Sequence, residues 1–251
     1  MSNKMFVKKI SVGLIACAAS LFSTLSQGVP IASFDTQVNV NVSSTFVSSE
    51  FESFLCCNDV YVEGNALGSA SGTGDGGPDT LAAGDIGVLN AAANGEATGV
   101  GSYVDSVWST SGYLVIDNKF GLSAITGDVT FEIFLSANIF TDELYSDAYA
   151  GAYIYIENYA ADIIFDYFIE FESFYEGAGT FGENKSQTIV VTGLTIDAGD
   201  FEEYYIEIDA VGFAEVSEPG GILLVGLALV FAVRKRKMSA NPICSRASSL
   251  L

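Results

Sequence analysis

Carboxylates are the most abundant side chains in this sequence that could hold a metal ion or serve as an acid and a base. Two groups occur on Gly-containing segments, one with Asp75, Asp79 and Asp85 and the other with Asp197, Asp200, Glu202 and Glu203. Hard oxygen ligands on such loops suit Ca²⁺. Neither spacing matches an EF-hand or a repeat calcium loop, so the alternative is a set of solvated turn acids. We expect no cofactor, with calcium as the candidate to test.

Catalysis by these carboxylates finds little support in the sequence. Histidine is absent, which removes the commonest general base and the Ser-His and Cys-His nucleophile pairs. A glycosidase needs only two carboxylates, but the sequence has 31 acids and no spacing that singles out a pair. We therefore expect a protein that is not an enzyme, with a carboxylate glycosidase as one alternative.

Cysteine chemistry is confined to one adjacent pair, Cys56-Cys57, because Cys17 and Cys244 lie in the terminal segments. Neighbouring residues of an ideal strand point to opposite faces, so a disulfide between them needs a strained turn. The possibilities are a disulfide between Cys56 and Cys57, two thiols in different environments, or a link between molecules.

Tyrosines are a third group with binding potential. Those concentrated in the second half of the chain are Tyr145, Tyr149, Tyr153, Tyr155, Tyr159, Tyr167, Tyr204 and Tyr205. Such rings could form a stacking platform for sugars, but cross-strand pairs that fill a sandwich explain most of them better.

The charge distribution excludes one class of partner. Between Asp35 and Glu215 the chain has 30 acids against two lysines, Lys119 and Lys185, a formal charge of −28. A nucleic-acid partner is excluded because no basic surface remains to displace counterions from phosphates. A body this acidic stays soluble and attracts cations.

The two ends of the chain have the composition of targeting segments. Residues 1–9 are basic, residues 10–25 are apolar, and Ser26-Gln27-Gly28 offers small residues for cleavage, as in a secretory signal peptide. Residues 14–17 also resemble a lipobox that would make Cys17 a lipidated first residue. Near the other end, an apolar stretch of residues 220–233 would span only about 21 Å as a helix, less than a bilayer core.

The C-terminal segment as a whole resembles a PEP-CTERM sorting signal of Gram-negative bacteria. The motif Val216, Ser217, Glu218 and Pro219 precedes the apolar stretch, and the basic cluster Arg234, Lys235, Arg236 and Lys237 follows it. Glu218 and Pro219 match the family's Glu-Pro core, and Ser217 replaces its first proline. The resemblance implies recognition by an exosortase, a membrane protease that cuts near the motif, after a transient stay of the precursor in the inner membrane.

Between these ends, apolar and polar residues alternate with a period of two. In residues 162–172, Ile163, Phe165, Tyr167, Ile169 and Phe171 alternate mostly with acids, as in a strand with one buried and one anionic face. About nine such segments predict an all-β fold, an antiparallel, jelly-roll-like β-sandwich flanked by a signal helix and a short transmembrane helix. Residues 69–77 are expected to form a flexible loop, and residues 141–146 or 81–93 to form a short helical turn.

These patterns divide the chain into a signal peptide (1–28), a β-sandwich body (29–215), a sorting signal (216–237) and a tail (238–251). The sorting resemblance implies an exported protein of the cell surface or extracellular matrix, with the secretion machinery, an exosortase and exopolysaccharide as partners. We expect a non-enzymatic structural or adhesive role in an exopolysaccharide matrix or biofilm. A calcium-dependent carbohydrate-binding module is the alternative from a different class.

Overall fold

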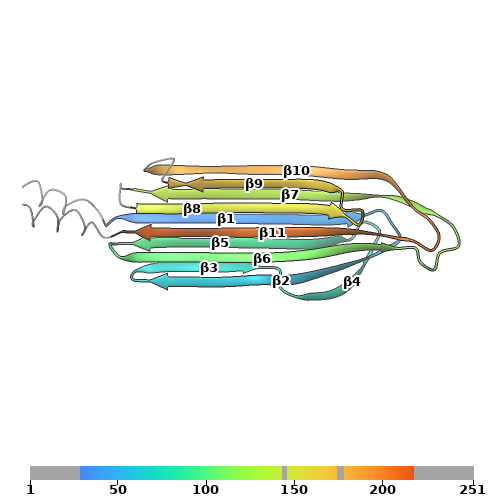
Figure 1. Ribbon diagram of the computed structural model, residues 1–251, viewed down its shortest axis with the longest axis horizontal. Helices are drawn as coiled ribbons and strands as arrows, with labels where there is room; N and C mark the ends of the chain where they lie inside the picture. Colours follow the sequence, from blue (N-terminus) through green and yellow to red (C-terminus); the bar gives the residue numbers. More distant parts are fainter. Residues whose placement is uncertain (1–28, 143–145, 174–177, 218–251) are drawn as a thin grey trace, which may run out of the picture.

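The computed structural model describes residues 29–142, 146–173 and 178–217, which form an elongated all-β body (Figure 1). Eleven strands run through these residues: β1 Ile31–Ser44, β2 Ser48–Glu63, β3 Ala66–Gly72, β4 Gly76–Ala82, β5 Ile86–Thr98, β6 Ser102–Asp117, β7 Ile125–Thr141, β8 Ser146–Asn158, β9 Ile163–Glu172, β10 Gly179–Ile196 and β11 Phe201–Val216. The prediction of an all-β fold is confirmed.

The strands form two antiparallel sheets. One has five strands in the order β10-β7-β1-β5-β3, and the other has six in the order β4-β2-β6-β11-β8-β9. Among the pairings within the described residues, only β8 and β9 join strands that follow each other in the sequence. Every other pair of consecutive strands lies in different sheets.

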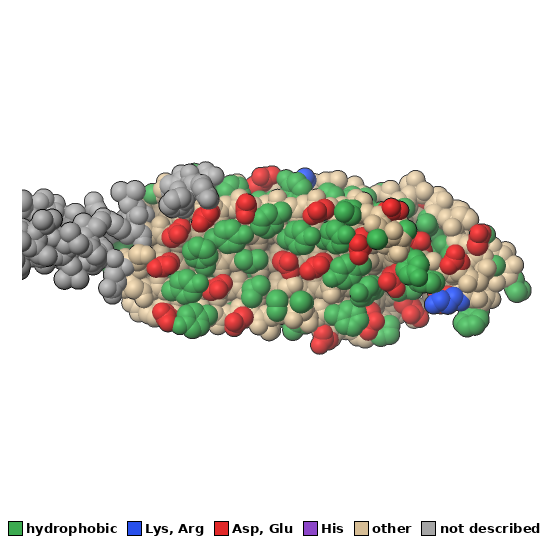
Figure 2. Space-filling model, in the orientation of Figure 1, with side chains coloured by type: hydrophobic (Ala, Val, Ile, Leu, Met, Phe, Trp, Pro, Cys, Tyr) green, Lys and Arg blue, Asp and Glu red, His purple; other side chains and the backbone are tan. Residues whose placement is uncertain are grey.

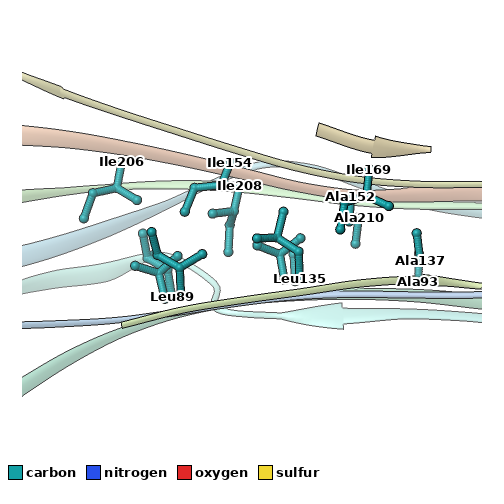
Figure 3. Close-up of a cluster of buried hydrophobic side chains, with 14 of the residues drawn as sticks. Leu89, Ala93, Leu135, Ala137, Ala152, Ile154, Ile169, Ile206, Ile208 and Ala210 are labelled. Carbon is teal, nitrogen blue, oxygen red and sulfur yellow. The ribbon is translucent and has the colours of Figure 1, made fainter. Parts of the chain in front are cut away.

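Strict alternation builds the core between the sheets. Along β11, every second residue from Tyr204 to Val216 is buried and the residues between them face outward. Side chains of both sheets meet in the middle, where Leu89 and Leu135 lie opposite Ile154, Ile206 and Ile208 (Figure 3). Each Å² of apolar surface removed from water stabilises the fold by about 25 cal/mol. Because the branched side chains of this layer are completely buried, the layer is the main source of stability.

Two expectations for local structure are wrong. Residues 69–77 are not simply a flexible loop, because β3 and β4 occupy most of this range, and the residues between them carry the chain from one sheet to the other. Thr73 N donates to Asn90 O at 2.9 Å at this crossing. Residues 81–93 contain no helical turn: β5 begins at Ile86, and Leu89, Ala91 and Ala93 alternate inward.

The first and last strands meet at one end of the body. The turn between β5 and β6 joins them, because Gly99 N donates to Pro30 O at 2.9 Å and Gly101 N donates to Val216 O at 2.7 Å. The loops before β7, β9 and β11 lie at the opposite end, which we call the distal end. The chain therefore enters and leaves the body on the same side.

The expected signal helix, the expected transmembrane helix and the tail lie outside the described residues. Within the described part, no helix is long and apolar enough to cross a bilayer.

Candidate functional site

The outward face of the six-stranded sheet carries most of the groups that could bind a ligand. None of its strands contains a lysine or an arginine. Aromatic rings and carboxylates alternate along and across these strands, and Figure 2 looks onto this surface. We call it the aromatic–acidic face, and it lies mainly on β2, β6, β8, β9 and β11.

The rings on this face contact one another across the strands. Tyr103 on β6 lies 6.0 Å from Tyr61 on β2 and 6.4 Å from Phe213 on β11, measured between ring centroids, and Tyr149 on β8 continues the row at 5.9 Å from Phe213. The planes of the last three rings are within 20° of parallel from one to the next. Such pairs stabilise a sheet by about 0.2–1 kcal/mol each, so this row has a structural role.

Three strands repeat the same short pattern, a tyrosine followed two residues later by a glutamate on the same face. The phenol of Tyr155 donates to Glu157 Oε2 at 2.6 Å, that of Tyr205 donates to Glu207 Oε2 at 3.1 Å, and Tyr61 donates to Glu63. The hydrogen bond to Glu157 raises the pKa of Tyr155 to about 12. Burial, followed by the charge of Glu207, raises the pKa of Tyr205. These phenols stay protonated at neutral pH and hold the carboxylates in fixed positions.

A depression of about 250 Å³ lies on this face at the distal end. Its lining residues are Tyr113, Glu157, Asn158, Tyr159, Ala161, Glu203 and Tyr205. Tyr205 is at the centre, because the strand register places it directly between Tyr113 on β6 and Glu157 on β8. The rings of Tyr113 and Tyr205 are 5.2 Å apart at an angle of 46°. We call this the distal depression.

The loop that forms one wall of the distal depression is tightly organised. Asp162 N donates to Asn158 Oδ1 at 2.8 Å, and Ala161 N donates to Asn158 O at 2.9 Å. Ala161 has a φ of 61° and is the one non-glycine residue with positive φ in the described part of the chain. A side chain in this conformation costs on the order of 1 kcal/mol. The loop therefore holds Ala161 in a strained conformation beside the depression.

The same loop presents Tyr159 to solvent at the rim. Tyr159 is 65% exposed, and its ring packs edge-on against Phe201 at 4.8 Å. Phe201 in turn lies under Lys119, whose Nζ is 4.5 Å from the ring centroid and 3.8 Å from Asp117 Oδ2. Because Phe201 packs against Tyr159 on one side, the exposed side of the Tyr159 ring is free to contact a ligand.

The chemistry of the distal depression is that of a binding site for a polar ring. Tyrosine rings provide apolar faces, while two carboxylates and a carboxamide provide hydrogen-bond partners for hydroxyl or amine groups. A second hollow of about 400 Å³ lies over β1, β3 and β5, and it is lined by Ser33, Phe34, Asp35, Leu67, Gly68, Ser69, Asn94, Gly95 and Glu96. Its one aromatic residue, Phe34, is buried in the core. This hollow lacks the stacking surfaces of the distal depression.

Three of the candidate calcium ligands, Asp75, Asp85 and Asp200, accept hydrogen bonds from backbone N–H groups with their carboxylates. Asp75 Oδ1 accepts from Leu55 N at 2.7 Å, Asp85 Oδ2 from Ala82 N at 2.9 Å and Asp200 Oδ1 from Phe201 N at 2.9 Å. Asp75 and Asp85 flank opposite ends of β4. Because the seven residues of this strand are extended, the two ends are about 20 Å apart. Asp79 lies in that strand, and Asp197 O accepts from Asp200 N at 3.2 Å. Within the described residues, no three His, Cys, Asp or Glu side chains gather as a metal site would require.

The adjacent cysteines are free and exposed. A β-bulge in β2 shifts the register between Leu55 and Cys57, so that Cys57 faces Ser109 on the outward side. The expectation of an ideal strand therefore does not apply to this pair, because the bulge interrupts regular alternation between Leu55 and Cys57. Cys57 is exposed overall, but partial desolvation of its thiol, followed by the nearby Cys56, raises the pKa of Cys57.

The predicted tyrosine set divides between the two faces. Tyr149, Tyr153, Tyr155 and Tyr205 are on the aromatic–acidic face and Tyr159 is at its rim, whereas Tyr204 is buried against Phe131 at 5.5 Å. Tyr167 is on the inward side of β9, where Lys185 Nζ lies 3.2 Å from its ring centroid. Tyr145 lies outside the described residues. Sequence reasoning missed Tyr61, Tyr103 and Tyr113; the repeated Tyr-X-Glu pattern was a signal for Tyr61 alone.

The expected sorting motif, residues 216–219, begins where β11 ends. Val216 is buried, and Ser217 Oγ donates to Glu215 Oε1 at 2.8 Å. Glu218, Pro219 and the basic cluster 234–237 lie outside the described residues. No protein-family model, curated protein or solved structure matches this chain.

Proposed function

We propose that this protein is exported and has a non-enzymatic structural or adhesive role in an exopolysaccharide matrix or at the cell surface of a Gram-negative bacterium. Two separate sets of residues support this. The chain ends have the composition of a signal peptide and of an exosortase-processed sorting signal, in which the apolar stretch 220–233 would serve as the short transmembrane segment. The body offers a surface suited to a polysaccharide.

The observation that carries the proposal is the distal depression. Tyr113, Tyr159 and Tyr205 stand beside Glu157 and Glu203 on an open sheet surface. Aromatic rings that contact the apolar side of a sugar, next to carboxylates that accept from its hydroxyls, form an ordinary carbohydrate site. The depression is open to solvent and can therefore accept an internal unit of a long chain.

The sorting part of this proposal is tested on cells. The double variant Glu218→Ala/Pro219→Ala should accumulate as uncut precursor in the membrane fraction, while the wild type loses its C-terminal segment. Pro242→Ala, in the tail beyond the basic cluster, is the matched control and should be processed normally. Equal processing of both variants would contradict the exosortase assignment.

The adhesive part is tested with the mature protein purified from the cells that export it. The protein should co-sediment with exopolysaccharide from the same cells and should release no new reducing ends. Loss of co-sedimentation on calcium chelation would favour the alternative of a calcium-dependent carbohydrate-binding module. Release of reducing ends would favour the glycosidase alternative, with Glu157 and Glu203 as its carboxylate pair.

A further inference from the structure

The distal depression combines aromatic rings and negative charge in a way that selects the charge of its ligand. Three tyrosines and two glutamates line it, and no lysine or arginine does. Aromatic rings attract cations through their negative faces, and carboxylates attract them directly. A neutral hydroxyl group can only donate a hydrogen bond to the same groups, so it is bound less strongly than a cation.

The two glutamates approach the depression from different strands. Glu157 on β8 is positioned by the hydrogen bond from Tyr155 at 2.6 Å, which occupies Oε2. Glu203 on β11 lies two residues before Tyr205 on the same outward side. A ligand lying over Tyr205 is therefore flanked by a carboxylate on each of two strands.

The surroundings strengthen this charge selection. In the described residues the two lysines are Lys119 and Lys185, and both already contact aromatic rings. Lys119 also pairs with Asp117, so it is poorly placed to attract an anion to the depression. An acidic sugar would meet the carboxylates of this face without a compensating cation, which is unfavourable at distances below the Debye length.

We propose that the distal depression binds an amino sugar through its protonated amine, as a unit of a cationic polysaccharide. The ammonium group lies between Glu157 and Glu203, and the apolar side of the sugar ring lies against Tyr205 or Tyr159. This inference rests on the proposed role in a polysaccharide matrix and names the chemical class of the chain that is bound.

The test compares two ligands that differ only at the nitrogen. Glucosamine oligosaccharides carry free amines, and their N-acetylated counterparts have the same rings without the charge. Calorimetric titration of the mature protein, at a fixed salt concentration near physiological, should give at least about tenfold tighter binding of the free-amine form, the gain of one charge-assisted hydrogen bond. Equal binding of both forms would overturn the assignment of an amine while leaving polysaccharide binding intact.

A pair of charge-matched variants separates the depression from the general acidity of the face. Glu157→Gln/Glu203→Gln should lose most of the preference for the free amine. Asp59→Asn/Glu170→Gln removes the same charge elsewhere on this face and should keep the preference. An equal loss in both variants would show diffuse attraction to the acidic surface and would overturn the proposal, even if the wild type co-sediments with its own matrix.

Discussion

The indole nitrogen of Trp108 lies directly against the backbone of Gly72. A Cβ added at Gly72 would come within 2.2 Å of Trp108 Nε1 and within 2.3 Å of Asn90 O. The single tryptophan of the chain therefore fits under β3 only because residue 72 has no side chain. Since Trp108 packs against the core, this contact fixes the short strand β3 to the sheet that faces it.

We expect Gly72→Ala to destabilise the body by about 1–3 kcal/mol, the usual range for overpacking. The nearest backbone oxygen cannot move without disturbing β5. Gly74→Ala is the control, because nothing lies within 4 Å of a Cβ built there, and it should be nearly neutral. Urea unfolding of both variants measures the difference, and equal midpoints would contradict the packing of Trp108 under β3.

The two faces of β9 should respond in opposite ways to substitution. Ile169 is buried, and Glu170 faces solvent. Ile169→Asp places an unpaired charge in the core and should cost at least about 3 kcal/mol, whereas Glu170→Gln should change stability by less than about 0.5 kcal/mol. Circular dichroism of the two variants during thermal unfolding gives the comparison. Tolerance of Ile169→Asp would mean that the faces are reversed.

Acid should stabilise the body over part of the pH range. Burial, and then the charge of Asp59, raises the pKa of Asp105 above 3.8 in the folded state. Because the pKa of Asp105 is higher in the folded state, its protonated carboxyl contributes to the free energy of unfolding. This contribution is complete below about pH 4 and is lost as pH rises through the folded-state pKa. Asp105→Asn should therefore raise the melting temperature at neutral pH and have little effect near pH 4. A larger gain at pH 4 than at pH 7 would contradict the sign of this shift.

Salt should have a related effect, because the carboxylates of the face repel one another. Added monovalent salt is expected to raise the melting temperature by screening this repulsion. Millimolar calcium should add little once about 0.5 M monovalent salt has shortened the screening length to roughly 4–5 Å. A large additional shift with calcium would show a specific site in place of the general screening expected here.

Alkali should unfold the protein as tyrosines ionise. Burial raises the pKa of Tyr204 from 10.0 to about 12, with a smaller contribution from Glu202. The contribution of the protonated Tyr204 phenol to the stability of the fold is complete below about pH 10 and is lost as pH rises through about 12. Tyr204→Phe should move the alkaline unfolding midpoint to higher pH, as followed by tyrosinate absorbance. An unchanged midpoint would show that this phenol does not limit alkaline stability.

The sequence predicted single strands better than it predicted how they pair. Alternation placed Phe165, Tyr167, Ile169 and Phe171 on the inner side of β9, but a bulge near Glu157 turns Ile163 outward, where it is 61% exposed. The strands β3 and β4 were missed because Gly- and Ser-rich segments have low strand propensity, and contacts such as Trp108 with Gly72 override it.

The site was hidden for a related reason. The Tyr-X-Glu pattern is visible in the sequence, but the contact of Tyr205 with Tyr113 and Glu157 depends on pairing between strands far apart in the chain. Residues 69–77 show the same limit of sequence-based prediction. The chain passes there from β3 in one sheet to β4 in the other, and nothing in the local sequence indicates this change of sheet. Local periodicity contains no information about which strands become neighbours.

The body is elongated and its first and last strands meet at one end, so it would act as a spacer arm on any surface to which that end was attached. Along β11, Glu203 and Val216 are 13 positions apart, about 40 Å of extended chain. A surface that held the C-terminal segment would carry the distal depression at the outer tip of this arm. The acidic faces of neighbouring copies would repel one another and keep the copies apart, with each distal depression facing away from the surface.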